Sequence, residues 1–345
     1  MKKPAIDWNG KKKINLALQG GGSHGAFTWG VLDHLLEDGR LDVEAISGTS
    51  AGAMNAVVYA EGYLDGGREG ARKALEAFWR AVSDGGSLSQ GWSGAFDKMM
   101  MPFGYDKSPM FWWADMVTHY ASPYEFNPLG LNPLRDMLSK AVDFKKVRAC
   151  ENLKLFISAT NVKTGKIAVF ERQNLTPDHV MASACLPLVF QAVVIDGESY
   201  WDGGYMGNPA LFPLFYDSAC ADTMIVQINP IERDETPHTA IEIQNRLNEI
   251  TFNGALLREL RAVEFVQRLC DQGKIGPPDY MRPLMHRIDG AAPLSQFSAA
   301  SKMDSSWSSL TALRDIGRAA AKSWLAKHYD DVGTRDTLDL RAEFS

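Results

Sequence analysis

The chain has 345 residues, of which 45% are hydrophobic and 23% are charged. This composition is typical of a folded globular protein and excludes fibrous and disordered classes, and no apolar run reaches the roughly 20 residues needed to span a bilayer. The formal net charge of -6 argues against nucleic acid as a partner and against electrostatic capture by an anionic membrane. Any membrane contact is therefore expected to be transient and apolar.

The amino-terminal tail, residues 1–13, is basic, but the apolar run after it has the length of a strand and leads directly into glycines. A signal peptide would have a longer apolar segment and a cleavage site, so we expect a cytoplasmic protein. The four cysteines lie far apart with no CxxC pair, which predicts buried thiols rather than disulfides or a metal site. No cofactor is expected, and the sequence leaves homo-oligomerisation open.

The first part of the chain alternates strand-like and helix-like stretches. The predicted strands cover residues 14–19 and 43–47, and the predicted helices cover 26–37, 51–63 and 68–82. This strand-helix order predicts parallel strands joined by right-handed crossovers.

Residues 84–128 have no clear periodicity and are rich in glycine, methionine and aromatic residues. A connection of this length is usually functional or mobile. One interpretation is an acyl pocket or a lid, since methionine adapts to flexible chains; the other is that these side chains simply cover the core. The residues concerned are Met99, Met100, Met101, Phe103, Met110, Phe111, Trp112 and Trp113.

The later part of the chain changes character near residue 230. Before it, helices are expected at 132–142 and 176–185, and strands at 153–162, 167–171, 192–195, 198–201 and 223–228. After it, we expect one long helix over 238–270 or a pair broken near Gly254, a strand at 281–288 and a helix at 306–328. We therefore divide the chain into an α/β domain, 14–230, and a largely helical C-terminal extension packed on it, 231–345.

Gly20, Gly22 and Gly25 form a GxGxxG turn between a predicted strand and a predicted helix. A dinucleotide-binding turn has the same pattern, but it requires an acidic residue at the end of the next strand. The only acid of that strand, Glu44, lies near its start. A nucleotide site is therefore disfavoured.

A second turn, Gly48-Thr49-Ser50-Ala51-Gly52, has the GxSxG pattern. Its small residues allow a sharp turn between a strand and a helix, which exposes the serine oxygen at the edge of the sheet. Ser50 would lie at a helix N-terminus, where free amides and the helix dipole favour negative charge. The pattern indicates a nucleophile.

A serine nucleophile needs a base, which is usually a histidine. His286 and His328 come late in the chain, as in α/β-hydrolases, but each falls inside a predicted strand or helix. Asp202 is the better candidate, because the glycines that follow it, Gly203 and Gly204, let backbone and substrate approach closely. A DGG sequence alone is also an ordinary turn signal.

Four blocks in this order, GGGSHGAFTWGVL, GTSAG, ASACLPLVF and DGG, resemble those of patatin-like phospholipases. The resemblance extends over residues 14–228 and implies a three-layer α/β/α sandwich with a mainly parallel central sheet. It also implies a Ser-Asp dyad, with Ser50 as nucleophile and Asp202 as base. The implied oxyanion hole is the turn that contains Gly20, Gly21, Gly22, Ser23 and Gly25. Many family members carry arginine or lysine in this turn where this chain has Ser23 and His24, which leaves open whether a cation assists the hole.

The implied activity is hydrolysis of a lipid or other carboxylic ester, as in phospholipases A, lysophospholipases and esterases, through an acyl-serine intermediate. An acyltransferase, a hydrolase of short hydroxyacyl esters such as storage-polyester fragments, and a non-catalytic lipid-binding protein are the alternatives. Transferases of the malonyl-transfer type normally have histidine before the serine, where this chain has Thr49. Because an unperturbed aspartate, with a pKa of about 3.9, is a weak base, the implied dyad requires either that direct contact and desolvation raise the basicity of Asp202 or that proton transfer is concerted.

Overall fold

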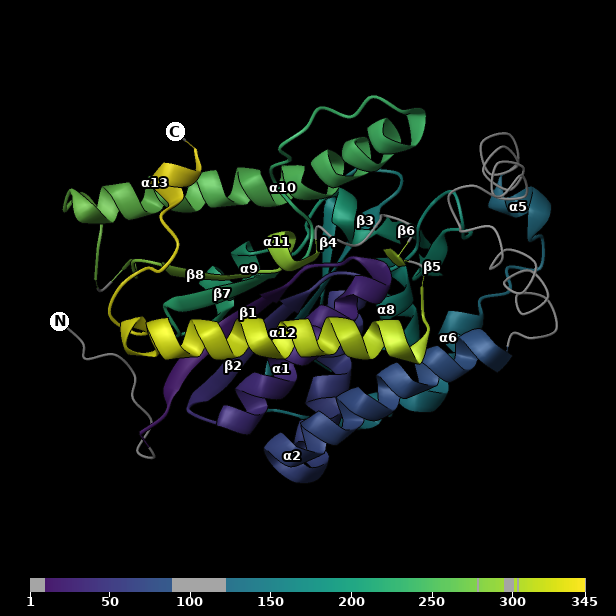
Figure 1. The fold of residues 1–345 in the computed structure, drawn as a ribbon, viewed down its shortest axis with the longest axis horizontal. Helices are drawn as coiled ribbons and strands as arrows, with labels where there is room; N and C mark the ends of the chain where they lie inside the picture. Colours follow the sequence, from purple (N-terminus) through teal and green to yellow (C-terminus); the bar gives the residue numbers. More distant parts are fainter. Residues whose placement is uncertain (1–9, 89–121, 278, 295–300, 303, 345) are drawn as a thin grey trace.

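The computed structural model describes residues 10–88, 122–277, 279–294, 301–302 and 304–344 (Figure 1). The eight methionine and aromatic candidates between Met99 and Trp113 lie outside the described residues, as does most of the segment 84–128. The prediction of an acyl pocket or lid in that segment therefore stays a prediction.

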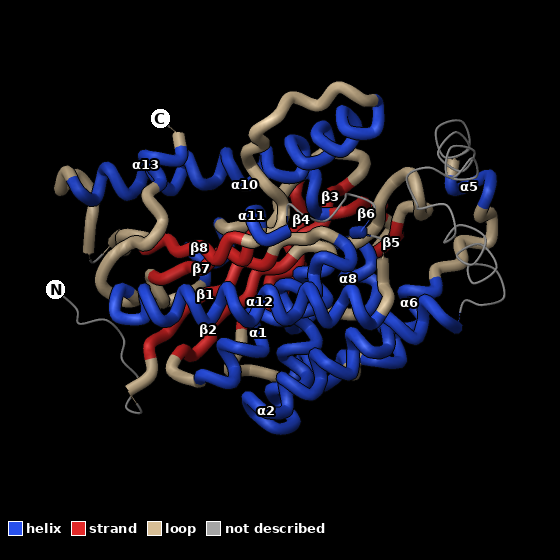
Figure 2. The backbone as a smooth tube through the Cα atoms, viewed as in Figure 1, coloured by secondary structure: helices blue, strands red, loops and turns tan. Residues whose placement is uncertain are grey.

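The centre of the molecule is an eight-stranded, mainly parallel sheet (Figure 2). Its strands are β1 (Lys12–Leu18), β2 (Leu41–Gly48), β3 (Lys154–Asn161), β4 (Ile167–Glu171), β5 (Val193–Ile195), β6 (Glu198–Asp202), β7 (Asp222–Gln227) and β8 (Leu284–Asp289). The order is β5-β6-β3-β2-β1-β7-β8, with β4 also paired to β3. Strands β3, β2, β1, β7 and β8 are parallel to one another, whereas β4, β5 and β6 form antiparallel pairs.

Helices cover both faces of the sheet (Figure 1). One face carries α1 (Gly25–Asp38), α2 (Ala51–Leu88), α6 (Pro133–Ala141), α7 (Phe144–Ala149), α8 (Pro177–Ser183) and α12 (Trp307–His328), and the other carries α9 (Phe212–Asp217), α10 (Ala240–Asp271) and α13 (Leu340–Glu343). Two short helices, α5 (Pro123–Phe126) and α11 (Ala291–Leu294), complete the described set. Alternate strand residues feed two separate cores: Leu16 and Leu18 join the first, and Ala17 joins the second. The three-layer α/β/α prediction is confirmed.

Most predicted helices and strands are present, with two differences in detail. The predicted helices 51–63 and 68–82 follow one another within α2, where Gly66 and Gly67 leave helical geometry and form a kink. Gly254 does not break α10, which is continuous over 32 residues. A glycine inside a helix costs only about 1 kcal/mol relative to alanine, and the buried side chains of Leu256 and Leu260 anchor the helix beside it.

The C-terminal part is more than a helical layer. Its strand β8 pairs in parallel with β7 and so extends the central sheet. Its helix α12 packs closely on α1, and glycines on both helices allow this approach. A Cβ atom at Gly30 would lie 1.9 Å from the carbonyl oxygen of Arg314, and one at Gly317 would lie 2.0 Å from that of Phe27. In the described part of the chain, no helix is both long and apolar enough to cross a membrane.

Candidate active site

Ser50 lies in a sharp turn between β2 and α2. Its φ angle of 54° is in the left-handed region, which is strained for a residue with a side chain. Glycine at positions 48 and 52 allows this tight turn. A Cβ atom at Gly48 would lie 2.7 Å from the backbone of Gly52, and one at Gly52 would lie 2.3 Å from the carbonyl oxygen of Leu18. The Ser50 N–H donates to Ser183 Oγ at 2.9 Å. The elbow is thus held in one conformation.

The neighbours of Ser50 point into the protein. Thr49 is fully buried, and its hydroxyl donates to the carbonyl oxygen of Gly207 at 2.6 Å and lies 2.5 Å from Ser158 Oγ. Ala51 begins α2 beneath the glycine turn, where a Cβ atom at Gly25 would lie 2.6 Å from the Ala51 Cβ. The elbow therefore leaves little room for larger residues.

Ser50 and Asp202 meet because β2 and β6 pair with the same edge of β3. Gly48 at the end of β2 pairs with Ile157, and Asp202 at the end of β6 pairs with Ala159, while β4 occupies the opposite edge. Since β2 and β6 run in opposite directions, their final residues approach each other along β3. The Ser50 side chain lies close enough to the Asp202 carboxyl to lower its pKa.

Asp202 is only 3% exposed. Burial raises the pKa of its carboxyl from 3.8 to about 7, although hydrogen bonds from Gly204 and Ser50 act in the opposite direction. The Gly204 N–H donates to Asp202 Oδ1 at 2.7 Å, and the Asp202 N–H donates to the carbonyl oxygen of Cys185 at 2.8 Å. The carboxyl is fixed in place and changes protonation near neutral pH.

The two glycines after Asp202 are required by close packing. A Cβ atom at Gly203 would lie 2.2 Å from the carbonyl oxygen of Ser158, and one at Gly204 would lie 2.1 Å from the ring of Phe252. Phe252 belongs to α10, so the C-terminal part of the chain closes over this loop.

The glycine turn faces the elbow directly, because a Cβ atom at Gly20 would lie 2.7 Å from the Cβ of Ser50. Two buried asparagines hold it there. The Gly20 N–H donates to Asn208 Oδ1 at 2.7 Å, and Asn229 Nδ2 donates to the Gly20 carbonyl oxygen at 2.8 Å. The Gly20 peptide is therefore fully engaged on both sides.

The backbone N–H groups of the turn differ in whether they already donate a hydrogen bond. The Gly25 N–H donates to the carbonyl oxygens of Gly22 and Ser23. Among the described residues, by contrast, the N–H groups of Gly21 and Gly22 donate no hydrogen bond, and both residues line the cavity beside Ser50. Of the five turn residues predicted for an oxyanion hole, Gly20 and Gly25 shape the turn, Gly21 and Gly22 offer donors, and Ser23 lines the cavity.

A cavity of about 370 Å³ opens beside Ser50 and Asp202. Its apolar wall consists of Met54, Phe78, Trp79, Val82, Leu134, Ala184, Leu186, Phe190 and Phe252. Its polar lining consists of the glycine turn from Gly20 to Ser23 together with Asn208, Asn229 and Lys302. A concave, mostly apolar cavity with a few fixed polar groups is typical of a small-molecule site. Within the described residues, no group of three or more His, Cys, Asp or Glu side chains is placed to hold a metal ion.

His24 is a buried member of the glycine turn. Its Nε2 lies 2.7 Å from Ser301 Oγ. Burial, with a smaller contribution from the charge of Lys302, lowers the pKa of His24 to about 4. His24 is therefore neutral at physiological pH and does not place a cation in the turn.

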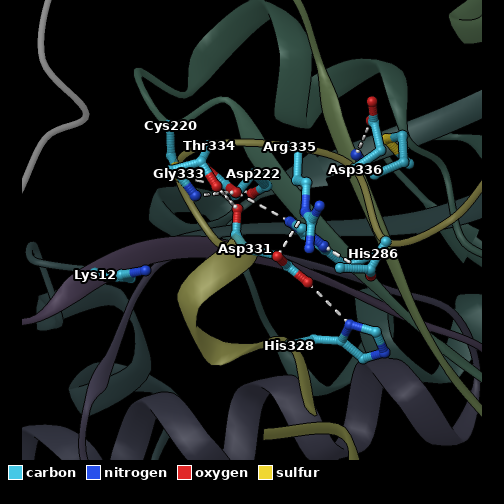
Figure 3. Close-up of polar contacts among 12 residues, drawn as sticks. Lys12, Cys220, Asp222, His286, His328, Asp331, Gly333, Thr334, Arg335 and Asp336 are labelled. Carbon is cyan, nitrogen blue, oxygen red and sulfur yellow. Dashed lines mark hydrogen bonds and ion pairs between the residues drawn. The ribbon is translucent and has the colours of Figure 1, made fainter.

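The two late histidines lie in a polar network at the other end of the sheet (Figure 3). His286 Nε2 lies 2.9 Å from Asp222 Oδ1, and His328 Nδ1 lies 3.0 Å from Asp331 Oδ2. Asp222 is the first residue of β7, whereas Ser50 follows the last residue of the parallel strand β2. Neither histidine lines the cavity, so a carboxylate rather than an imidazole faces the serine.

Sequence reasoning missed four residues of this site: Ser183, Asn208, Asn229 and Lys302. Ser183 lies in the ASACLPLVF block, but nothing in that block assigns it a role; the other three are single polar residues in stretches with no recognisable motif. The two asparagines have a weak signal in the sequence. Each precedes a proline, Asn208 shortly after the loop that follows Asp202 and Asn229 shortly after β7, and polar side chains in such turns tend to bind backbone groups.

Comparison with known proteins bears on the family of this chain. A family model for patatin-like phospholipase matches residues 16–215, more than half of the 345-residue chain.

Among solved structures, the chain is similar to VipD from Legionella pneumophila, with 13% identity, a TM-score of 0.41, and coverage of 95% of this chain and 71% of that one. It is also similar to the type III effector protein ExoU, with 15% identity, a TM-score of 0.32, and coverage of 91% and 53%. A third structure, full-length ExoU with SpcU from Pseudomonas aeruginosa, has 15% identity, a TM-score of 0.30, and coverage of 96% and 76%. Curated protein sequences give no significant match. On the strength of the family match, the chain belongs to the patatin-like phospholipase family.

Proposed function

We propose that this protein is a serine lipid acyl hydrolase in which Ser50 is the nucleophile and Asp202 is the general base. Family membership supports lipid acyl hydrolysis in general terms. One observation carries the assignment of residues: Ser50 and the buried carboxyl of Asp202 lie within interaction distance of each other and line the same largely apolar cavity.

The proposed reaction proceeds in two stages. Asp202 accepts the hydroxyl proton as Ser50 Oγ attacks the ester carbonyl carbon, and the N–H groups of Gly21 and Gly22 stabilise the resulting oxyanion. Such a donor contributes on the order of 3 kcal/mol to transition-state stabilisation. Asp202 returns the proton to the departing alcohol, which leaves an acyl-serine. A water molecule, deprotonated by Asp202, then hydrolyses the acyl-serine and restores Ser50.

The raised pKa of Asp202 supports its role as a base. A carboxylate with a pKa near 7 has the basicity of a histidine, whereas an ordinary aspartate does not. The cause is burial, so the same packing that brings Gly203 and Gly204 against their neighbours also prepares the base.

The apolar wall of the cavity supports a fatty acyl chain as the bound part of the substrate, in a phospholipid, a lysophospholipid or another ester. The test is a panel of these esters with a Ser50→Ala protein as blank, in which released fatty acid is measured. We expect acid release from at least one member. Transfer of the acyl group to an added alcohol in preference to water would identify a transferase, cleavage of hydroxybutyrate oligomers alone would identify a polyester hydrolase, and binding without turnover would identify a lipid-binding protein.

Activity is expected to fall steeply as the pH drops below 7. The pKa of Asp202 is raised to about 7 by burial, so protonation at lower pH removes the base. At pH 5 about one molecule in a hundred would keep the carboxylate, and kcat/KM would be roughly 100-fold below its value above pH 8. Stopped assays across pH 5–9 on a soluble ester, with refolding checked after each incubation, measure this profile. A profile that is flat across that range would contradict Asp202 as the base.

An apolar rim beside the cavity supports transient contact with a lipid surface. Leu186 and Phe190 line the cavity, and between them Leu188 and Val189 are 54% and 41% exposed. We expect Leu188→Ser to lower hydrolysis of vesicle lipid severalfold and to leave a monomeric short-chain ester unaffected, because only the first requires interfacial contact. Leu64→Ser, at an exposed leucine of α2, is the matched control. Equal effects on both substrates would remove the interfacial role.

The state of the cysteines supports a cytoplasmic location. All four are free thiols, and Cys150, Cys185 and Cys220 are buried, as expected for a reducing compartment. Cell fractionation with antibody detection tests this proposal, and recovery in an oxidising compartment would contradict it.

A further inference from the structure

Lys302 brings an ammonium group to the wall of the catalytic cavity from the C-terminal part of the chain. Its backbone packs against the glycine turn, because a Cβ atom at Gly22 would lie 2.5 Å from the Lys302 carbonyl oxygen. Lys302 Nζ donates to Asn229 Oδ1 at 2.8 Å, and the same asparagine donates to the Gly20 carbonyl oxygen. One side chain therefore connects this cation to the turn beside Ser50.

The charge of Lys302 lies at one end of the cavity together with two arginines. Among the described residues, Lys302 forms no ion pair with a carboxylate. Glu249 acts on it at longer range, but the Glu249 carboxylate is already bound by Arg233 at 2.5 Å and Arg246 at 3.2 Å. Three cations around one carboxylate leave an excess of positive charge, although the chain as a whole carries a net charge of -6.

Burial makes this arrangement costly when the cavity holds no anion. Desolvation lowers the pKa of Lys302, because a buried ammonium loses hydration without gaining a counter-ion. An anion bound in the cavity would restore the lost stabilisation, and charge-assisted hydrogen bonds to phosphate are among the stronger polar contacts.

The two ends of the cavity differ in polarity, which orients an ester. The apolar wall suits an acyl chain, whereas Asn229 and Lys302 form a polar end next to the glycine turn. With the ester carbonyl at Gly21 and Gly22, the alcohol part of the substrate is the part left to lie beside Lys302.

We propose that Lys302 selects esters whose alcohol part carries a phosphate group, so that acylated glycerol phosphates are preferred to neutral glycerides. This inference rests on the proposed function, and it assigns to Lys302 a specificity that the Ser50-Asp202 dyad does not require.

A matched pair of soluble esters tests the inference: octanoylglycerol phosphate and monooctanoylglycerol, both below their aggregation limits. We expect wild type to prefer the phosphate ester in kcat/KM by roughly 10- to 100-fold, the range of a hydrogen bond to a charged group. Lys302→Met, which keeps length but removes charge, should bring the ratio close to one, and Lys302→Arg should keep the preference. Lys322→Met, at an exposed lysine of α12, removes the same charge elsewhere and should change nothing.

The outcomes separate this inference from the proposed function. A purely structural role of Lys302 would slow both esters equally in Lys302→Met and leave the ratio unchanged, which would overturn the inference while the hydrolase assignment stands. Absence of turnover together with absence of fluorophosphonate labelling at Ser50 would instead overturn the function.

Protection from fluorophosphonate labelling tests phosphate binding without any turnover. Glycerol phosphate should slow fluorophosphonate labelling of wild type more than glycerol does, and should lose this advantage in Lys302→Met. Inorganic phosphate that protects as well as glycerol phosphate would indicate a site for free phosphate and would also overturn the inference.

Discussion

A Ser50→Ala protein is expected to cleave every ester that wild type cleaves on the order of 10⁵-fold more slowly, because the covalent route is lost and only binding and the oxyanion donors remain. Fluorophosphonate labelling should disappear with it. The fold should be unaffected, since the hydrogen bond from residue 50 to Ser183 Oγ comes from the backbone N–H and alanine has the same φ preferences as serine. Product release under substrate saturation, with the melting temperature as a folding check, measures both expectations.

The control for this substitution is a serine that lies away from the cavity. Ser139 lies on α6, where its hydroxyl donates to the carbonyl oxygen of Arg135 on the protein surface, so Ser139→Ala should keep full activity and labelling. Hydrolysis that persisted in Ser50→Ala within tenfold of wild type would place the nucleophile elsewhere and would remove the basis of the proposed mechanism.

The elbow is the part of the site that local sequence predicts best. Gly48 is needed by contact with Gly52 in the same turn, and Gly52 by contact with Leu18 at the end of β1, so the tightness of the elbow follows from residues in the first part of the chain. The sheet layers are similarly local, because alternation in strands such as β1 separates the two cores. The mainly parallel sheet follows from the strand-helix order of the first 60 residues.

The partner of Ser50 could not be predicted in this way. Asp202 reaches it only because β6 pairs with the same edge of β3 as β2, beyond the point where β2 ends, and no pattern in the sequence specifies that register. At the sequence level, the family resemblance alone made Asp202 more than an ordinary turn residue. The loop that follows the buried Asp202 also packs against Phe252 of α10, which is remote in the chain.

The C-terminal part was the least predictable. A largely helical composition after residue 230 gave no reason to expect that β8 extends the sheet, because a single strand among long helices is a weak signal. Lys302 and Asn229 reach the cavity through packing of distant segments, and a lone lysine in sequence is normally a solvent-exposed residue. The lysine that packs against the glycine turn thus lies outside the four blocks of the family resemblance.

Asp202→Asn is expected to lower kcat/KM roughly 10³-fold, within the usual range for loss of a general base. Asparagine matches aspartate in shape and its Oδ1 still accepts from the Gly204 N–H, but it takes no proton from Ser50. The rise in activity between pH 5 and pH 8 should disappear along with the rate. Asp196→Asn, in the turn between β5 and β6, is the matched control and should keep both the rate and the pH profile.

Stability measurements separate a lost base from a damaged fold. Because the folded-state pKa of Asp202 is raised above its unfolded value, ionisation weakens the wild-type fold as the pH rises through 7, whereas asparagine does not ionise. Asp202→Asn should therefore gain melting temperature relative to wild type between pH 5 and pH 8. A variant that showed this gain and yet kept its activity would mean that the buried carboxylate is present but is not the base, and that Ser50 is activated by its position at the start of α2 alone.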